Sequence, residues 1–135
     1  MNGARVLIVD DNQPNIELAQ FLLEDNGFVV DTASNAEQAL ACIADTRPDL
    51  ILMDIQLPGM DGLHLTSQLK ANPATSSIPT IAFTAYAMKG DEGKMRAAGC
   101  DGYIAKPVDV ARFAQQIEQV LQSSAAVPPG SGMRD

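Results

Sequence analysis

Three near-continuous apolar runs constrain the fold of this chain more than any other feature. They read VLIV at 6–9, LILM at 50–53 and TIAF at 80–83. A strand with one face in solvent alternates apolar and polar residues, whereas a parallel strand covered on both faces is apolar along its length. The runs therefore predict the central strands of a parallel sheet with helices on both faces.

Segments with helical spacing separate the strand candidates, so the chain alternates between two kinds of element. We expect strands at 5–9, 28–32, 50–54, 79–83 and 102–105, and helices at about 12–27, 35–45, 63–70, 88–98 and 109–122. In the first two helices the residues predicted to face the core are Ile16, Ala19, Leu22, Leu23, Ala36, Ala39, Leu40 and Ile43. The fifth helix shows the same spacing at Val110, Phe113, Ile117, Val120 and Leu121. This spacing is typical of βαβ units, whose right-handed crossovers build a doubly wound α/β sheet.

The length of 135 residues suits one domain with a core of its own. We expect that domain to occupy residues 1–122 and a flexible tail, rich in Pro, Gly and Ser, to occupy 123–135. Neither a membrane-spanning run nor an export signal is recognisable, which predicts a cytoplasmic protein. Cys42 and Cys100 have no metal-site spacing, and we expect both to be buried free thiols.

The net charge of −8 disfavours direct binding to nucleic acid or to anionic lipid, because phosphate groups attract basic surfaces. The partners we expect are therefore proteins, with no direct nucleic acid contact and no membrane contact.

Polar residues stand where the predicted strands end. Asp10 and Asp11 follow the first strand, Asp54 ends the third, Thr84 follows the fourth, and Lys106 follows the fifth. In an open α/β sheet, ligands bind outside the carboxyl ends of the strands, where the connections diverge to opposite faces. We therefore expect these side chains to share one site.

Carboxylates gathered at one edge repel each other unless a cation lies among them. An all-oxygen ligand set that the protein fills only in part suits Mg²⁺, which keeps several waters and binds phosphate oxygens. A metal ion, the Lys106 ammonium and the Thr84 hydroxyl would together stabilise a transferring phosphoryl group. Asp54 is the best candidate for its nucleophile, because a carboxylate can form an acyl phosphate.

The chain resembles a response-regulator receiver domain of bacterial two-component signalling over about residues 4–122. The resemblance rests on VDDN at 9–12, MDIQLPGMDG at 53–62, TA at 84–85 and KP at 106–107. Within the family the chain is most similar to stand-alone receivers of the DivK-like cell-division type, through ILMDIQLPGMDGL, AMKGDE at 87–92 and the GC-x-x-YI-x-KP run from Gly99. The resemblance implies a flavodoxin-like (βα)5 fold with strand order 2-1-3-4-5.

The resemblance also assigns roles at the site. Asp54 would be the phosphoacceptor, and Asp11 and Asp54 would bind Mg²⁺ directly. Asp10 would act through metal-bound water, and the backbone carbonyl of Gln56 would complete the protein ligands.

The resemblance also implies how the domain would bind the phosphoryl group and change its affinity for a partner. Thr84 would bond a phosphoryl oxygen and shift toward it, Lys106 would pair with the phosphate, and Tyr103 would be the aromatic switch residue. The phosphoryl donor would be a histidine kinase or a histidine phosphotransfer protein, and the output would be a changed affinity for a downstream protein. Such a receiver catalyses only its own phosphoryl transfer and dephosphorylation, and we expect a monomer or a weak dimer.

Each of these residues also has a simpler interpretation. Asp10 and Asp11 alone could favour a helix start through the helix dipole, Lys106 could be a solvated lysine, Thr84 a capping hydroxyl and Tyr103 a half-buried strand aromatic. The order and strand placement of the whole set favour the shared site.

Two other functions compete with the leading one. A haloacid-dehalogenase-like Mg²⁺ phosphatase also uses an aspartate at a strand end, but its DxDx(T/V) signature is absent because positions 10–13 read DDNQ. The chain could also be a receiver excised from a hybrid histidine kinase or a longer response regulator.

Overall fold

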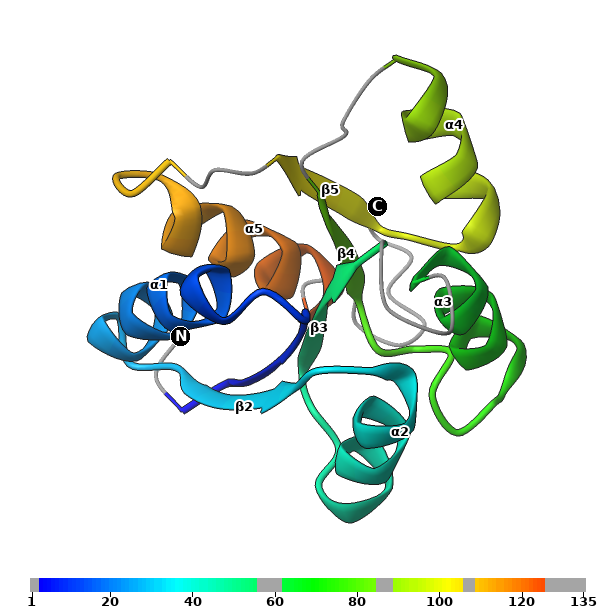
Figure 1. The fold of residues 1–135 in the computed structure, drawn as a ribbon, viewed down its shortest axis with the longest axis horizontal. Helices are drawn as coiled ribbons and strands as arrows, with labels where there is room; N and C mark the ends of the chain where they lie inside the picture. Colours follow the sequence, from blue (N-terminus) through cyan, green and yellow to red (C-terminus); the bar gives the residue numbers. More distant parts are fainter. Residues whose placement is uncertain (1–2, 56–61, 85–88, 106–108, 126–135) are drawn as a thin grey trace.

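The computed structural model describes residues 3–55, 62–84, 89–105 and 109–125 (Figure 1). Its strands are β1 (Arg5–Val9), β2 (Val29–Ala33), β3 (Leu50–Asp54), β4 (Thr80–Thr84) and β5 (Gly102–Ala105). Its helices are α1 (Gln13–Asp25), α2 (Ala36–Asp45), α3 (Gly62–Ala71), α4 (Lys89–Ala98) and α5 (Phe113–Ala125). Strands and helices alternate along the chain, as the sequence predicted.

The strands form one parallel sheet in the order β2-β1-β3-β4-β5, which confirms the predicted doubly wound α/β fold. In Figure 1, α1 and α5 lie on one side of this sheet, and α2 and α3 lie on the other. The central strands β3 and β4 are buried along their whole length, as their apolar runs indicated. The edge strand β2 is partly exposed, as an edge position allows.

Strand pleating divides the core into two clusters. Val6 and Ile8 of β1 pack in the cluster under α1 and α5, whereas Leu7 and Val9 pack in the cluster under α2 and α3. Successive side chains of a strand point to opposite faces, so an unbroken apolar run supplies both clusters at once. This is why the central strands contain almost no polar residue before their carboxyl ends.

The helix faces follow the predicted pattern except at Leu40 and at Val110, which is 62% exposed and precedes the first residue of α5. All of the residues predicted to be buried in α1 are buried. In α2 the prediction was wrong for Leu40, which is 42% exposed, while Ala36, Ala39 and Ile43 are buried. Successive helix positions lie about 100° apart, so Leu40 falls at the rim of the stripe that Ala39 and Ile43 define.

The ends of some elements also differ from the prediction. The strands β2 and β4 each begin one residue later than expected. The predicted fifth helix starts at Phe113 rather than at Asp109, because Asp109 Oδ1 accepts the N–H of Ala111 at 3.1 Å and closes a separate turn first. The helix α5 then runs to Ala125, and residues 126–135 of the predicted tail lie outside the described residues.

Both cysteines are free, as expected, but they are half-buried rather than buried. Cys42 lies on α2 beside the edge strand β2, with its Sγ 3.9 Å from the carbonyl oxygen of Thr32. Burial raises the pKa of the Cys100 thiol, which a hydrogen bond with the Thr66 side chain partly opposes. None of the helices in the described part of the chain is both long and apolar enough to span a bilayer.

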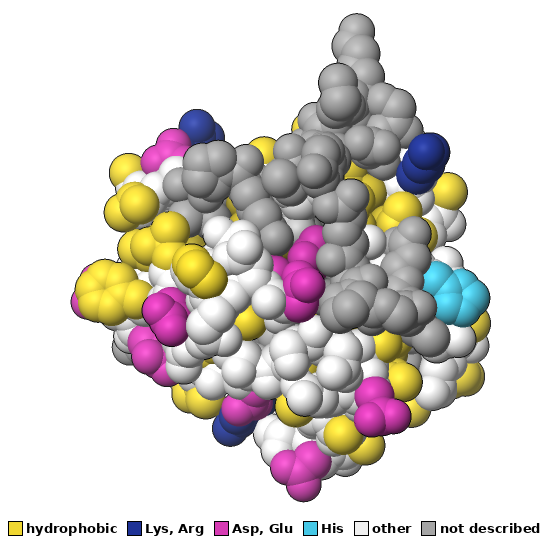
Figure 2. Space-filling view, in the orientation of Figure 1, with side chains coloured by type: hydrophobic (Ala, Val, Ile, Leu, Met, Phe, Trp, Pro, Cys, Tyr) yellow, Lys and Arg dark blue, Asp and Glu magenta, His cyan; other side chains and the backbone are white. Residues whose placement is uncertain are grey.

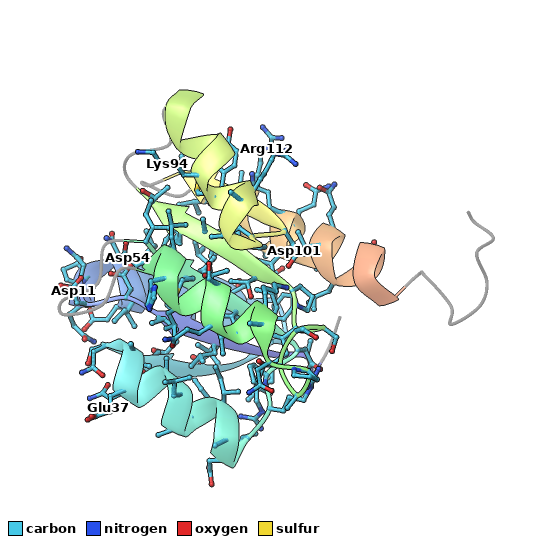
Figure 3. All side chains as sticks on the ribbon, turned by 90° about the vertical axis from the view of Figure 1, so that its right-hand side faces the viewer. Asp11, Glu37, Asp54, Lys94, Asp101 and Arg112 are labelled. Atoms are coloured by element: carbon cyan, nitrogen blue, oxygen red, sulfur yellow. The ribbon has the colours of Figure 1, made fainter. Side chains whose placement is uncertain are left out.

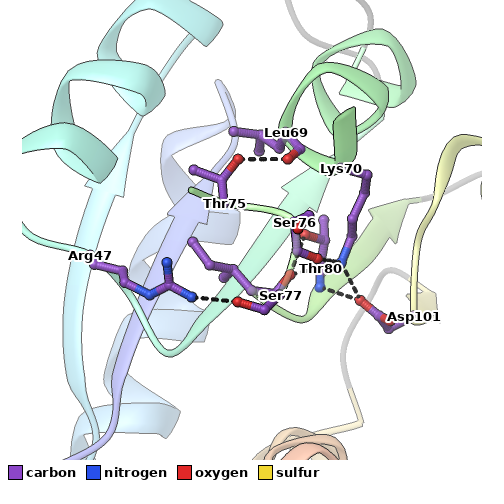
Figure 4. Close-up of polar contacts among 9 residues, drawn as sticks. Arg47, Leu69, Lys70, Thr75, Ser76, Ser77, Thr80 and Asp101 are labelled. Carbon is purple, nitrogen blue, oxygen red and sulfur yellow. Dashed lines mark hydrogen bonds and ion pairs between the residues drawn. The ribbon is translucent and has the colours of Figure 1, made fainter. Parts of the chain in front are cut away.

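A polar cluster ties the amino ends of β4 and β5 to the end of α3 (Figure 4). The Lys70 ammonium donates to the carbonyl oxygen of Ile78 at 2.8 Å and lies 2.9 Å from Asp101 Oδ2. The same Asp101 oxygen accepts the backbone N–H of Thr80 at 2.8 Å. Asp101 therefore pairs with the Lys70 ammonium and accepts a backbone N–H of β4, at the start of the β4–β5 pair.

Replacing Asp101 tests this cluster. Asp101→Ala should lower the free energy of unfolding by about 1–2 kcal/mol, mainly because the partly buried Thr80 N–H loses its acceptor and the half-exposed ion pair contributes little. Asp101→Asn keeps an acceptor oxygen and should lose about half as much. Urea unfolding of the three proteins checks this, and equal losses in the two variants would contradict the assigned roles.

Candidate functional site

Three predicted carboxylates meet at one edge of the sheet. One oxygen from each of Asp10, Asp11 and Asp54 lies within 4.8 Å of the other two. Figure 3 shows Asp11 and Asp54 together at one end of the strands, with Asp101 toward the other end. The structure thus brings together residues more than forty positions apart in the sequence, as the predicted site requires.

Asp10 and Asp11 are adjacent in the sequence but differ in their exposure to solvent. Asp10 is fully buried, its N–H continues the sheet by donating to the carbonyl oxygen of Ala33 at 3.0 Å, and its Oδ1 accepts the N–H of Asn12 at 2.9 Å. Asp11, one residue further, is exposed. Because β1 ends at Val9, both aspartates belong to the turn into α1. One carboxylate therefore lies inside the site and the other faces solvent.

The turn after β1 is stabilised by Asn12. Its side-chain oxygen accepts the N–H of Asn15 at 3.1 Å and caps α1, as predicted, while Pro14 lies in the first turn of the helix. Asn12 therefore orients Asp10 through its N–H and begins α1 through its side chain.

Asp54 is the last residue of β3 and is 5% exposed. The register of β1 and β3 pairs Val9 with Met53. The residues that follow these two, Asp10 and Asp54, therefore come to the same edge of the sheet. In Figure 2 a group of acidic side chains lies near the centre of the molecular face seen there, and further acidic and basic side chains lie toward its margins.

Thr84 and Tyr103 occupy the neighbouring strands. Thr84 is the last residue of β4, is 1% exposed, and pairs with Ala105. Tyr103 lies two residues before Ala105 on β5 and is 43% exposed. Its side chain lines a small cavity together with residues of α4 and of the segment before β5, among them Met95 and Cys100. The Thr84 hydroxyl is thus at the carboxyl edge of the sheet, and the Tyr103 ring is on the outer strand beside α4.

Two predicted site residues, Gln56 and Lys106, lie outside the described residues, so their roles stay predictions. Gly62, the first residue of α3, was not among the predicted site residues, yet it lies against the backbone of Asp54. The signal available was a glycine at a helix start a few residues after the candidate nucleophile.

The chemistry of the cluster fits a divalent cation. Its three donors are carboxylate oxygens, the hard ligands that Mg²⁺ and Ca²⁺ prefer. Like charges this close in a partly desolvated site repel each other, and a cation would convert that repulsion into attraction. Asp10, Asp11 and Asp54 are the described residues that could hold it.

A doubly wound sheet of this order, with acidic residues at the carboxyl ends of its first and third strands, defines the class of receiver domains. The family pattern described as the response regulator receiver domain matches residues 6–118. The chain belongs to this family, which serves two-component signalling and does not consist of classical enzymes. The phosphatase alternative is therefore set aside.

Among its relatives, the chain is similar to the polar-differentiation response regulator DivK of Brucella anthropi. The two are 47% identical over 116 residues, which cover 86% of this chain and 94% of that protein. A receiver domain protein (CheY-like) from Methanospirillum hungatei is 30% identical, covers 93% of this chain and 98% of its own, and has a TM-score of 0.84. The signal receiver domain of a histidine kinase from Syntrophus aciditrophicus is also 30% identical, with 96% of each chain covered and a TM-score of 0.82.

The repulsion within the cluster predicts a gain in stability when one charge is removed. In the absence of divalent cations, Asp54→Asn should raise the free energy of unfolding by on the order of 1 kcal/mol. Glu17→Gln on the exposed face of α1 is the control, because it changes the net charge equally away from the site. Urea unfolding in a chelator measures both. A gain no larger for Asp54→Asn than for the control would show that the three charges do not repel each other appreciably.

Proposed function

We propose that this protein is a phosphorylation-controlled receiver that accepts a phosphoryl group on Asp54 with Mg²⁺ and thereby changes its affinity for other proteins. The observation that carries the proposal is the grouping of Asp10, Asp11 and Asp54 within 4.8 Å at the end of the central strand. Similarity to DivK over most of the chain supports a role in the same kind of signalling.

In this proposal the phosphoryl donor is a phosphohistidine of a histidine kinase or of a histidine phosphotransfer protein. A carboxylate oxygen of Asp54 attacks the phosphorus, the bond from phosphorus to the histidine nitrogen breaks as the new P–O bond forms, and the leaving nitrogen is protonated. Asp11 and Asp54 would hold the metal directly, Asp10 would hold it through water, and the Gln56 carbonyl would complete the set. A Mg²⁺ ion held by these residues would supply the positive charge that offsets the acidic edge and the phosphoryl oxygens.

The other residues of the site hold the product and pass on the signal. Lys106 pairs with the phosphoryl group, and the Thr84 hydroxyl bonds one of its oxygens. Thr84 is buried at the end of β4, and Tyr103 is partly exposed on β5, so a shift of Thr84 would open space into which the Tyr103 ring can turn. Phosphorylation then biases an existing equilibrium between two states, and the face around α4, β5 and α5 changes partners.

The wider setting is part of the same proposal. We place the receiver domain in the residues up to the end of α5 at Ala125, and the protein in the cytoplasm as a monomer or weak dimer. A receiver that belongs to a hybrid histidine kinase is the second candidate, and the similarity to the signal receiver domain of a histidine kinase from Syntrophus aciditrophicus favours it. Both candidates use the same site, and the sequence of the native reading frame distinguishes them.

Replacing Asp54 tests the phosphoacceptor. With Mg²⁺ and a small phosphodonor, the wild type should gain the mass of one phosphoryl group, and Asp54→Asn should gain none because an amide oxygen is a poor nucleophile. Asp49→Asn is the matched control, since Asp49 precedes the same strand at its opposite end, where it accepts the Arg5 N–H. Intact mass measurement reads the result. Phosphorylation of Asp54→Asn at the wild-type rate would sink the assignment.

Replacing Thr84 tests the switch. Thr84→Ala should still be phosphorylated but should lose most of the change in amide hydrogen exchange that phosphorylation causes in β5. Thr80→Ala is the control, because Thr80 is equally buried at the other end of β4. A full response of β5 in phosphorylated Thr84→Ala would show that the signal does not pass through this hydroxyl.

A further inference from the structure

The first residue of α3 lies in unusually close contact with the proposed phosphoacceptor. A Cβ atom at Gly62 would overlap the carbonyl oxygen of Asp54 and would lie 2.7 Å from the Cα of Ile55. Both of these atoms are backbone, so no side-chain rotation can relieve the contact. Only glycine allows α3 to begin here while the Asp54 peptide stays where it is.

Hydrogen bonds hold this first turn of α3 from two sides. The Gly62 N–H donates to the carbonyl oxygen of Ile55 at 3.1 Å, and the hydroxyl of the fully buried Thr66 donates to the carbonyl oxygen of Gly62 at 2.9 Å. The Thr66 side chain is also hydrogen-bonded to Cys100, which precedes β5. The start of α3 is thus fixed between the residue after Asp54 and the connection from α4 to β5.

We propose that Gly62 and Thr66 are positioning residues for Asp54, and that they set the distance between its carboxylate and those of Asp10 and Asp11. The proposal rests on the Mg²⁺-dependent function proposed above. Neither residue is assigned a contact with the metal or the phosphoryl group. They act through the Asp54 peptide, whose place determines where the carboxylate of that short side chain can reach.

The choice of metal makes this role measurable. Mg²⁺ requires near-ideal octahedral geometry with ligands at about 2.0–2.1 Å, whereas Ca²⁺ accepts irregular geometry at about 2.3–2.6 Å. A displacement of Asp54 by a few tenths of an ångström should therefore weaken Mg²⁺ binding far more than Ca²⁺ binding. A role in folding alone would lower stability without changing the preference between the two ions.

The experiment is calorimetric titration of the whole protein with Mg²⁺ alone and with Ca²⁺ alone. Gly62→Ala and Thr66→Val should each lower the ratio of Mg²⁺ to Ca²⁺ affinity by about tenfold or more, the usual effect of losing support for a metal ligand. Gly93→Ala is the control for the first variant, because a Cβ at Gly93 meets no atom within 4 Å. Thr80→Val is the control for the second, because it removes another buried hydroxyl that bonds a backbone carbonyl, at the far end of β4.

An unchanged ratio in folded Gly62→Ala would overturn the proposal. Should Gly62→Ala fail to fold, Thr66→Val decides, because Val keeps the size of the buried side chain and removes only its hydrogen bonds. An unchanged ratio there, or an equal fall in Thr80→Val, would also overturn the positioning role. Absence of Mg²⁺ binding by the wild type would instead contradict the proposed function itself, so the two failures are distinguishable.

Discussion

Parallel pairing between β1 and β3 in the middle of the sheet is the constraint on which the rest of this structure depends. Both strands are apolar because helices cover them on both faces, and their register runs through the pair Val9 and Met53. The residue that follows each member of this pair is an aspartate, and both aspartates are buried at the same edge of the sheet. The hydrophobic pairing that stabilises the sheet therefore also gathers charges that repel each other.

Hydrogen bonds and close packing of the surrounding backbone oppose the repulsion between these carboxylates. Asp10 receives an N–H from Asn12, which also caps α1, and the Asp54 peptide lies against Gly62 at the start of α3. The carboxylates cannot separate easily, because each is attached to an element that packs on the core.

Much of the fold and part of the site could be predicted from the sequence. The meeting of Asp10, Asp11 and Asp54 is confirmed, and Thr84 and Tyr103 are at the strand positions expected. These predictions succeeded because parallel strands of similar length bring all their carboxyl ends to one edge. The catalytic and switch roles of these residues remain predictions, as do the roles of Gln56 and Lys106, which lie outside the described residues.

The sequence by itself determined the order of elements, the sheet with two covered faces and the acidic edge, because hydrophobic periodicity and strand ends are local properties. Only the tertiary structure decided that Leu40 lies at the rim of its helix, that Asp10 is buried while Asp11 is exposed, and that Gly62 lies against Asp54. Those outcomes depend on distances between segments far apart in the chain. No local pattern contains such distances, because they arise only when the helices pack on the sheet.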